Sequence, residues 1–263
     1  MPRIAYQGEP GAFSDDAARK LVPGAETAGY GTFDDAAAAV QDGTVELALL
    51  PVENSISGSV PRVYDLLWHD ERLSIVDEIV YRVVQNLIGI AGASVEDLRE
   101  VRSHPVALEQ CRKFLGRHHA MRATIVADTA GAVREITRLG NPAVGAIASS
   151  LAAERYGAEV MVPAIQDVAD NFTRFFLLRR DAPRADGTRA CVALSLANRP
   201  GSLRDALGAF ADDGLDLRTL VSRPSLERPF SYRFYCEITP VDRARLERAL
   251  AKIDGEARVL GLY

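Results

Sequence analysis

Four short polar clusters lie at transitions between predicted strands and loops. They are Glu53-Asn54-Ser55; Ser103-His104-Pro105 with Gln110-Cys111; Asp128-Thr129; and Asp170-Asn171-Phe172-Thr173-Arg174-Phe175. Capping and turn formation explain the Ser103 and Asp128 clusters taken alone. The last cluster is different, because Thr173 and Arg174 put a hydroxyl and a guanidinium into an otherwise apolar strand, where unpaired polar groups are costly. A carboxylate ligand would satisfy both groups.

Other motifs give no support to metal, nucleotide or serine-hydrolase chemistry. The chain has no HExxH, Walker loop, GxGxxG after a strand, GxSxG or zinc-type spacing. The cysteines Cys111, Cys191 and Cys236 are widely spaced, which predicts core residues and no disulfide framework. We therefore expect no metal and no cofactor. The turn Gly8–Gly11 could offer backbone N–H groups to an anion, but a tight turn is the simpler interpretation.

Apolar strands alternate with helical patterns through the first two thirds of the chain, which is typical of an α/β fold with a mostly parallel sheet. Strands are predicted at residues 4–7 and 45–50, and helices after Ser14, as N-cap, and over 33–41. The polar segment 51–59 then follows the carboxyl end of a buried strand. Ligands collect at such ends in open α/β sheets.

The rest of the chain continues this alternation and then changes character. Further strands are predicted at residues 73–90, 100–102, 123–127, 143–148, 159–163 and 173–179. Ser103 is a plausible N-cap for the helix that ends near Leu115. The charged Pro/Gly segment 181–189 indicates a linker. From residue 190 the predicted order is βαββαβ, the ferredoxin-like pattern.

Composition limits the class of partner. Of the 263 residues, 48% are hydrophobic and 25% charged, which is ordinary globular usage and excludes a disordered chain or a coiled coil. The net charge of −5 leaves no basic surplus for a phosphate backbone, so nucleic acid is not an expected partner. No apolar run approaches the ~18 to 20 residues that span a bilayer, and residues 1–14 hold no signal-peptide core. We expect no membrane association and a cytoplasmic location.

Three blocks of the sequence resemble blocks of the prephenate dehydratase family, in the same order. They are Leu50–Ser55 with Gly58-Ser59-Val60; Ser103-His104-Pro105 through Gln110-Cys111; and Gln166-Asp167 to Asn171-Phe172-Thr173-Arg174-Phe175. The resemblance extends over about the whole chain. It implies a two-lobed catalytic domain over residues 1–180, like the type 2 periplasmic binding proteins, with the active site between the lobes. It also implies an ACT regulatory domain over residues 190–263.

The resemblance assigns roles residue by residue. Thr173 matches the hydroxyl held to be central to catalysis, and Arg174 matches a cation that binds a substrate carboxylate. The matching catalytic and substrate-binding positions are otherwise Glu53, Asn54, Ser103, Gln110, Asn171 and Phe175. His104 shares its motif, but its place before Pro105 favours a role at the start of a helix.

The reaction of the family converts prephenate into phenylpyruvate in L-phenylalanine biosynthesis, with loss of the ring carboxylate as CO₂ and of the C4 hydroxyl as water. Arg174 suits the pyruvyl carboxylate that stays, because a tight grip on the departing carboxylate would stabilise the ground state. Thr173 is expected to donate a hydrogen bond to the leaving oxygen. Glu53, neutral beside a bound dianion, is the alternative donor.

Two other functions remain open at this stage. Arogenate is the close rival substrate, since it carries an amino group where prephenate has a keto group. A non-catalytic amino-acid sensor is the alternative from a different class, because the fold is shared with binding proteins. The Thr173-Arg174 pair argues against a pure sensor.

The last part of the sequence carries two motifs that resemble the phenylalanine site of ACT domains. The implied effector-binding residues are Gly201, Ser202 and Leu203 in one loop and Ser222, Arg223 and Pro224 in the other. Val221 stands where the family has a glutamate, which leaves feedback inhibition open. ACT sheets usually pair, so the resemblance implies a homodimer or a homotetramer. No chorismate mutase segment precedes Met1, and a single activity is expected.

Overall fold

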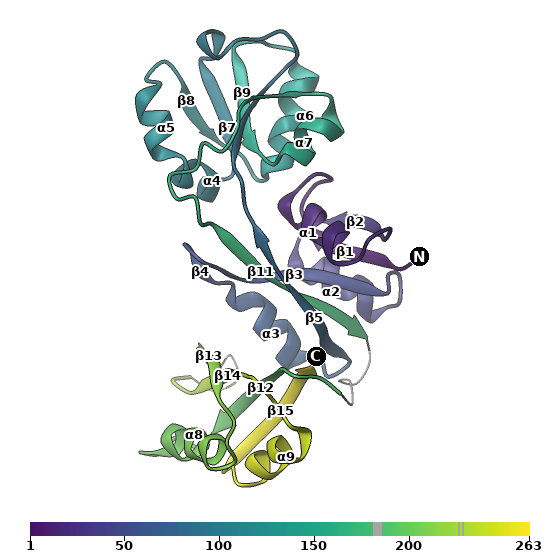
Figure 1. Ribbon diagram of the computed structural model, residues 1–263, viewed down its shortest axis with the longest axis vertical. Coiled ribbons are helices and arrows are strands. Elements are labelled where there is room, and N and C mark those ends of the chain that lie inside the picture. Colours follow the sequence, from purple (N-terminus) through teal and green to yellow (C-terminus); the bar gives the residue numbers. More distant parts are fainter. Residues whose placement is uncertain (181–185, 226, 228) are drawn as a thin grey trace. The chain divides into compact units, whose positions relative to one another are not determined.

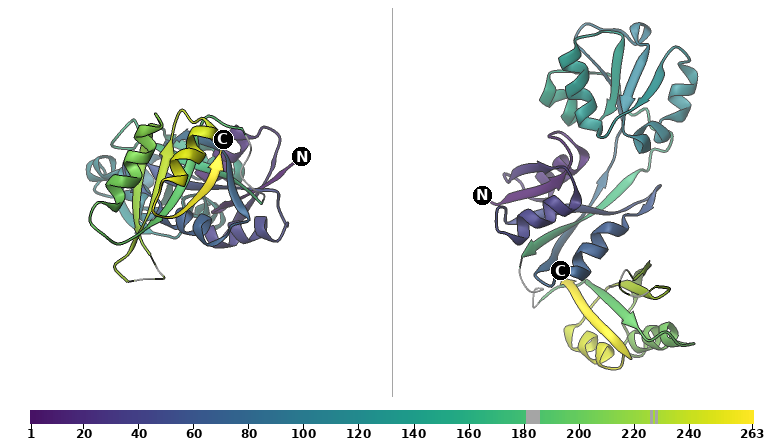
Figure 2. Two further views of the ribbon diagram at one scale, coloured as in Figure 1. Left: turned by 90° about the horizontal axis from the view of Figure 1, so that it is seen from below. Right: turned by 180° about the vertical axis from the view of Figure 1, so that it is seen from behind.

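The computed structural model of the chain describes residues 1–180, 186–225, 227 and 229–263. The chain forms two compact units, one of Met1–Gly58 with Ile79–Phe175 and one of Ser59–Glu78 with Phe176–Tyr263 (Figures 1 and 2). Of the predicted linker 181–189, residues 181–185 lie outside the described residues. The domain boundaries 1–180 and 190–263 stay a prediction.

The first lobe of the first unit is a parallel α/β layer. Strand β1 (Arg3–Gln7) pairs in parallel with both β2 (Glu26–Tyr30) and β3 (Leu47–Asn54). The sheet continues from β3 to β11 (Phe172–Arg180), and the short β4 (Gly58–Ser59) also pairs with β3. Two helices pack on these strands, α1 (Phe13–Leu21) and α2 (Phe33–Gln41).

The second lobe is a five-stranded sheet in the order β10-β6-β9-β7-β8. Its strands are β6 (Asn86–Gly89), β7 (Glu100–Ser103), β8 (Arg122–Ile125), β9 (Val144–Ala148) and β10 (Glu159–Val162). Strand β7 is parallel to its neighbours, whereas β6 is antiparallel to its own. The connecting helices are η1 (Val95–Asp97), α4 (Pro105–Gln110), α5 (Arg112–Arg117), α6 (Thr129–Leu139) and α7 (Ser150–Tyr156). Helices α4 and α5 cover one face of the sheet, and α6 and α7 the other (Figures 1 and 2).

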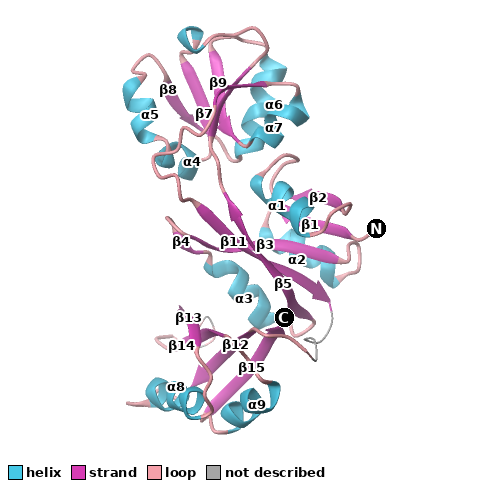
Figure 3. Ribbon diagram, viewed as in Figure 1, coloured by secondary structure: helices cyan, strands magenta, loops and turns pink. Residues whose placement is uncertain are grey.

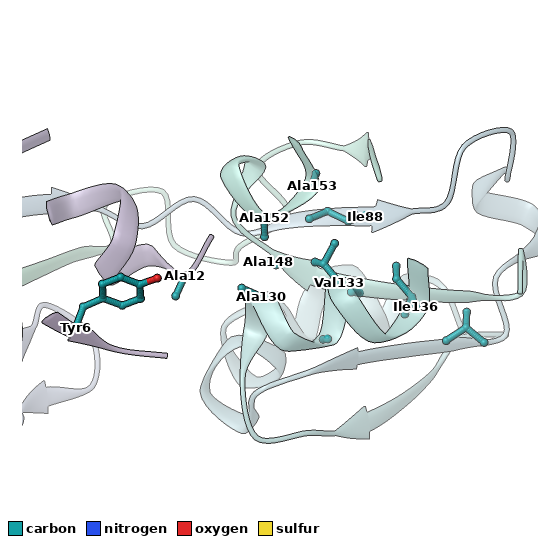
Figure 4. Packing of buried hydrophobic residues seen from close by; sticks show 12 residues of the cluster. Tyr6, Ala12, Ile88, Ala130, Val133, Ile136, Ala148, Ala152 and Ala153 are labelled. Atoms are coloured by element: carbon teal, nitrogen blue, oxygen red, sulfur yellow. The ribbon is translucent and has the colours of Figure 1, made fainter. Parts of the chain in front are cut away.

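Small residues join the two lobes. Tyr6 and Ala12 from the first lobe share a buried cluster with alanines of α6 and α7, among them Ala152 (Figure 4). Gly11 has a φ of +92°, and a Cβ there would lie 2.8 Å from the Cα of Ala152. Its carbonyl accepts a 2.6 Å hydrogen bond from Ser149 Oγ, and its N–H donates to Asp15. The glycine turn is therefore a packing feature, since its backbone groups are used inside the protein.

The second unit has the predicted ferredoxin-like topology. Its strands β12 (Ala190–Leu196), β13 (Leu217–Pro224), β14 (Tyr232–Ile238) and β15 (Gly255–Leu262) form an antiparallel sheet in the order β13-β14-β12-β15. Helices α8 (Ser202–Asp212) and α9 (Arg243–Ala251) pack on one face through a shared apolar cluster (Figure 3).

A helix from early in the chain completes this second unit. Helix α3 (Pro61–His69) and the first half of β5 (Leu73–Arg82) belong to it, and Ile75 pairs with Gly261 of β15. The Tyr64 ring lies 5.0 Å from the Tyr235 ring, and the Arg233 guanidinium lies 4.3 Å from the Trp68 ring. Aromatic and cation–π contacts thus attach α3 to the sheet.

Two predicted helix caps were wrong. Helix α1 starts at Phe13 after Ala12, so Ser14 lies inside the helix. The N-cap of α4 is His104, whose ring accepts from the Val106 N–H, as the interpretation of His104 as a helix-start residue requires. Ser103 does not cap this helix, because its hydroxyl donates to the Ile147 carbonyl at 2.6 Å.

Three sequence expectations can be compared with the described residues. Cys111, Cys191 and Cys236 are all buried free thiols, as expected for core residues. The described part of the chain holds no group of three or more His, Cys, Asp or Glu side chains that could bind a metal ion. Within these same residues no helix is long and apolar enough to cross a bilayer.

Asp128 caps helix α6 and gives a pH-dependent prediction. Its Oδ1 accepts from the Gly131 N–H at 2.6 Å, while burial and then the nearby Glu9 carboxylate raise the pKa of Asp128 above its ordinary value. The folded protein therefore holds this proton more tightly than the unfolded chain, and stability falls as the pH rises from the unfolded pKa to the folded one.

Replacing Asp128 by asparagine should remove this decline. Asparagine is an equally good N-cap and cannot ionise, so Asp128→Asn is expected to match or exceed wild-type stability at pH 7. The urea midpoint, measured between pH 4 and pH 7, should fall less with pH in the variant. A lower midpoint than wild type at pH 7 would contradict the prediction.

Candidate active site

The end of strand β3 lies beside the start of strand β11, which brings two of the predicted clusters together. Ser55 N donates to the Phe172 carbonyl at 2.8 Å, and the next pairs in sequence are Asn54 with Thr173 and Glu53 with Arg174. The partners run in opposite order along the two segments, as in an antiparallel pair. The sequence clusters at 53–55 and 170–175 therefore form one polar site.

Asn54 is the centre of this site, and the backbone fixes its orientation. Its Oδ1 accepts from the Ile56 N–H at 3.0 Å and from the Ser57 N–H at 2.9 Å. Because these donors are backbone groups, Nδ2 must be the atom that faces β11. There it lies near three acceptors: Asn171 Oδ1 at 2.8 Å, Phe172 O at 3.1 Å and Thr173 Oγ1 at 3.0 Å.

The same contact sets the direction of the Thr173 hydroxyl. Since Oγ1 accepts from Asn54, the Thr173 hydrogen is available to another acceptor. Among the described residues, no side chain or carbonyl accepts a hydrogen bond from the Thr173 hydroxyl. Thr173 is partly exposed, so its hydroxyl hydrogen can reach a ligand.

Two further amides extend the array. Asn171 is fully buried, and its Nδ2 donates to Gln110 Oε1 at 3.0 Å. Gln85 Nε2 donates to the same oxygen at 3.1 Å. Gln110 in turn lines a pocket of about 440 Å³, together with Ile56, Ser57, Val106, Glu109, Gln166, Asp167 and Val168.

Arg174 and Glu53 form an ion pair next to this array. Arg174 Nη2 lies 3.1 Å from Glu53 Oε2; the Arg174 side chain is 8% exposed and that of Glu53 46%. Neighbouring residues of a strand point to opposite faces, so this pair faces away from the Asn54–Thr173 pair. A carboxylate ligand was expected to satisfy both Thr173 and Arg174. Inside the protein Asn54 and Glu53 already supply one partner to each, and the Thr173 hydrogen remains available to a ligand.

Among the predicted catalytic and substrate-binding residues, Gln110 lines the pocket described above. Asn54, Asn171, Thr173 and Gln110 form one connected array, with Glu53 and Arg174 beside it. Ser103 is fully buried with its hydroxyl on Ile147, and Phe175 is 2% exposed in the core. Gln85 was missed, although an amide in the apolar run 83–90 was a visible signal.

The predicted effector residues lie in the second unit. Gly201 precedes α8 with a φ of +90°, and Ser202 and Leu203 line a small pocket of about 130 Å³. Ser222, Arg223 and Pro224 end strand β13. Arg223 Nη2 donates to Asp65 Oδ2 of α3 at 2.7 Å, and Asp65 is buried.

The chain is similar to proteins of one known family. The model of the prephenate dehydratase family matches residues 4–183. Arogenate dehydratase/prephenate dehydratase 1, chloroplastic, from Arabidopsis thaliana is 38% identical over 282 residues, covering 99% of this chain and 71% of the relative. The bifunctional N-acyl-homoserine lactone acylase/prephenate dehydratase of Komagataeibacter europaeus is 37% identical, covering 99% of this chain and 95% of the relative.

A solved structure supports the same assignment. The prephenate dehydratase from Arthrobacter aurescens in complex with L-Phe has a TM-score of 0.88 and 27% identity, covering 98% of this chain and 88% of the other. Fold and site together define a lyase-type dehydratase with a two-lobed α/β body. The chain belongs to the prephenate dehydratase family.

Proposed function

We propose that this protein converts prephenate into phenylpyruvate, CO₂ and water as a step of L-phenylalanine biosynthesis. The observation that carries the proposal is the Thr173 hydroxyl, which the amide of Asn54 turns into a donor, in an array that leads through Asn171 to Gln110 of the pocket. The reaction needs such a donor where the hydroxyl group leaves C4. It needs no metal and no cofactor.

The proposed chemistry is a single fragmentation. The bond from the ring to its carboxylate breaks, and its electron pair enters the ring as CO₂ departs. The C4–O bond breaks, and the oxygen takes up a proton and leaves as water while the ring becomes aromatic. A hydrogen bond from Thr173 stabilises the charge that develops on this oxygen.

The structure favours Thr173 over Glu53 as the donor. Glu53 is engaged in an ion pair with Arg174, and this pair lies on the strand face away from Asn54 and Thr173. In this scheme Gln110, and not Arg174, first contacts the pyruvyl carboxylate that remains in the product. Gln110 lines the pocket, whereas Arg174 is paired with Glu53. Arg174 binds that carboxylate in this scheme only after it exchanges partners.

The choice between prephenate and arogenate as substrate is tested by measuring turnover. Purified protein is incubated with prephenate or arogenate, and phenylpyruvate or phenylalanine is quantified by ultraviolet absorbance and chromatography. We expect phenylpyruvate from prephenate at a higher kcat/KM than phenylalanine from arogenate. The reverse ratio identifies an arogenate dehydratase, and no product from either substrate identifies a sensor.

We further propose that residues 190–263 are an ACT domain that binds L-phenylalanine. Its ferredoxin-like topology supports this assignment, and the Arthrobacter relative was solved with L-Phe. The proposed contacts are Gly201, Ser202 and Leu203 with Ser222, Arg223 and Pro224, in a homodimer or homotetramer. The proposed location is the cytoplasm, on the composition argument given above.

Arg223 offers a test that separates an effector role from a structural one. Asp65 is 5% exposed, so Arg223→Ala leaves a buried carboxylate without its cation. We expect a loss of about 1–3 kcal/mol in urea unfolding, since Arg223 itself is partly exposed. The double variant Arg223→Met with Asp65→Asn should recover most of it. Unchanged stability with a lost response of turnover to phenylalanine would instead assign Arg223 to the effector site.

A further inference from the structure

The hydrogen-bond direction of the whole amide array follows from two backbone groups. The N–H groups of Ile56 and Ser57 fix Asn54 Oδ1, and Asn54 Nδ2 then faces Asn171 Oδ1. Asn171 Nδ2 is consequently turned toward Gln110. Gln110 must accept this hydrogen bond with its side-chain oxygen, because two N–H groups cannot form a hydrogen bond with each other.

This direction determines what Gln110 offers to the pocket. Its Oε1 is occupied by Asn171 and Gln85, and its Nε2 has no acceptor in the part of the chain that the structure describes. Gln110 therefore presents N–H donors to a ligand. Such donors match a carboxylate or carbonyl oxygen.

Gln85 is the second residue that holds Gln110 in this orientation. It is 3% exposed, and its own backbone is fixed: the Gln85 N–H donates to Gln166 Oε1 at 3.1 Å, and its carbonyl accepts from Ile165 N at 2.8 Å. Its Oε1 is buried and finds no donor among residues 1–180, 186–225, 227 and 229–263. A buried acceptor without a partner is unfavourable. The hydrogen bond from Gln85 Nε2 to Gln110 is therefore the interaction that accounts for an amide at this buried position.

We infer that Gln85 is a positioning residue, which orients Gln110 so that the Gln110 Nε2 donates to a carboxylate oxygen of the bound substrate. The inference rests on the proposed function and extends it to substrate binding. With Gln85 removed, Asn171 alone restrains the Gln110 amide. A half-turn of that amide would then present its oxygen to the substrate and repel the carboxylate.

The test uses Gln85→Glu, which changes one atom and can take either hydrogen-bond role. A neutral carboxylic acid donates its O–H to Gln110 Oε1, as the glutamine does. An ionised carboxylate can only accept, so it repels Gln110 Oε1 and favours the turned amide, against the hydrogen bond that Asn171 donates to this oxygen. Burial makes this carboxyl titrate above the ordinary glutamate range, inside the range where activity can be measured.

The expected result is a pH-dependent KM. In Q85E the KM should be near the wild-type value at low pH and rise about tenfold as the carboxyl ionises, with kcat changing much less. In Q85M, which keeps the volume without the amide, the KM should be raised by a similar factor at every pH. The titratable or charged side chains on the neighbouring segments, present in all three proteins, are Arg82, Glu109, Cys111, Arg112, Lys113, Asp167 and Asp170. Ratios to wild type at each pH remove their contribution.

A second readout requires no turnover. The side-chain 15N–1H resonances of Gln110 should move with pH in Q85E and stay fixed in wild type and Q85M. A KM ratio that is flat with pH in Q85E, or resonances of Gln110 that do not move, would overturn the inference. Absence of wild-type turnover on both substrates would refute the proposed function, and the resonances would still decide the role of Gln85.

Discussion

Thr173→Val is expected to lower kcat by about 100-fold to 1000-fold while KM changes by less than about threefold. Valine keeps the shape of the side chain and removes the hydroxyl that Asn54 orients at 3.0 Å. The lost hydrogen bond is one that forms fully only as charge develops on the departing oxygen. A loss confined to the transition state appears in kcat and not in KM.

Two measurements make this result specific. Thr173→Ser retains the hydroxyl and should keep kcat within about tenfold of wild type, since only a methyl group is lost. Steady-state rates are compared with the urea midpoint of each variant, because Asn54 keeps two of its three acceptors and the fold should survive. A valine variant with wild-type kcat would remove Thr173 from the mechanism.

Asn54→Asp is the second large effect that we expect. One aspartate oxygen can still accept from the Ile56 and Ser57 N–H groups, but the other replaces an N–H₂ group that faces three acceptors. A carboxylate in that place has no proton to donate to Asn171 Oδ1 and the Phe172 carbonyl, and it would take the Thr173 hydrogen that the wild-type protein leaves available to the substrate. We expect a loss of about 2–4 kcal/mol in the free energy of unfolding and turnover reduced by more than about 100-fold.

Asn141 supplies a matched control for this substitution. Its Oδ1 also accepts from a backbone N–H, that of Ala143, but it lies on the exposed surface. Asn141→Asp should change stability by less than about 0.5 kcal/mol and leave turnover unchanged. Urea unfolding and kcat/KM are measured for both variants. Equal effects at the two positions would show that Asn54 is an ordinary turn residue.

Local patterns in the sequence were sufficient to predict much of this fold. Strand and helix periods predicted the α/β alternation and the βαββαβ order of the last part, and both are confirmed. The motifs also placed Asn54, Thr173 and Gln110 in one site, and the structure connects them through Asn171. These features depend on residues that are close in the chain or that share a motif.

What the sequence did not predict depends on contacts between distant segments. Arg174 was expected to await a carboxylate, but its partner Glu53 lies opposite it on another strand. Ser103 has the hydroxyl group of a cap or a ligand contact. Its actual role depends on the neighbouring strand, because the buried hydroxyl donates to the carbonyl of Ile147. Gln85 contacts Gln110 across 25 residues, and no local pattern announces such a pair.

The array from Gln85 to Thr173 has a consequence for the acid–base behaviour of the enzyme. Its members are amides and one aliphatic hydroxyl, and its direction starts from main-chain N–H groups of Ile56 and Ser57. None of these groups gains or loses a proton near neutrality. The pattern of donors offered to the substrate is therefore the same in acid and in alkali, and any bell shape in the rate profile originates in ionisable groups outside the array or in the substrate itself.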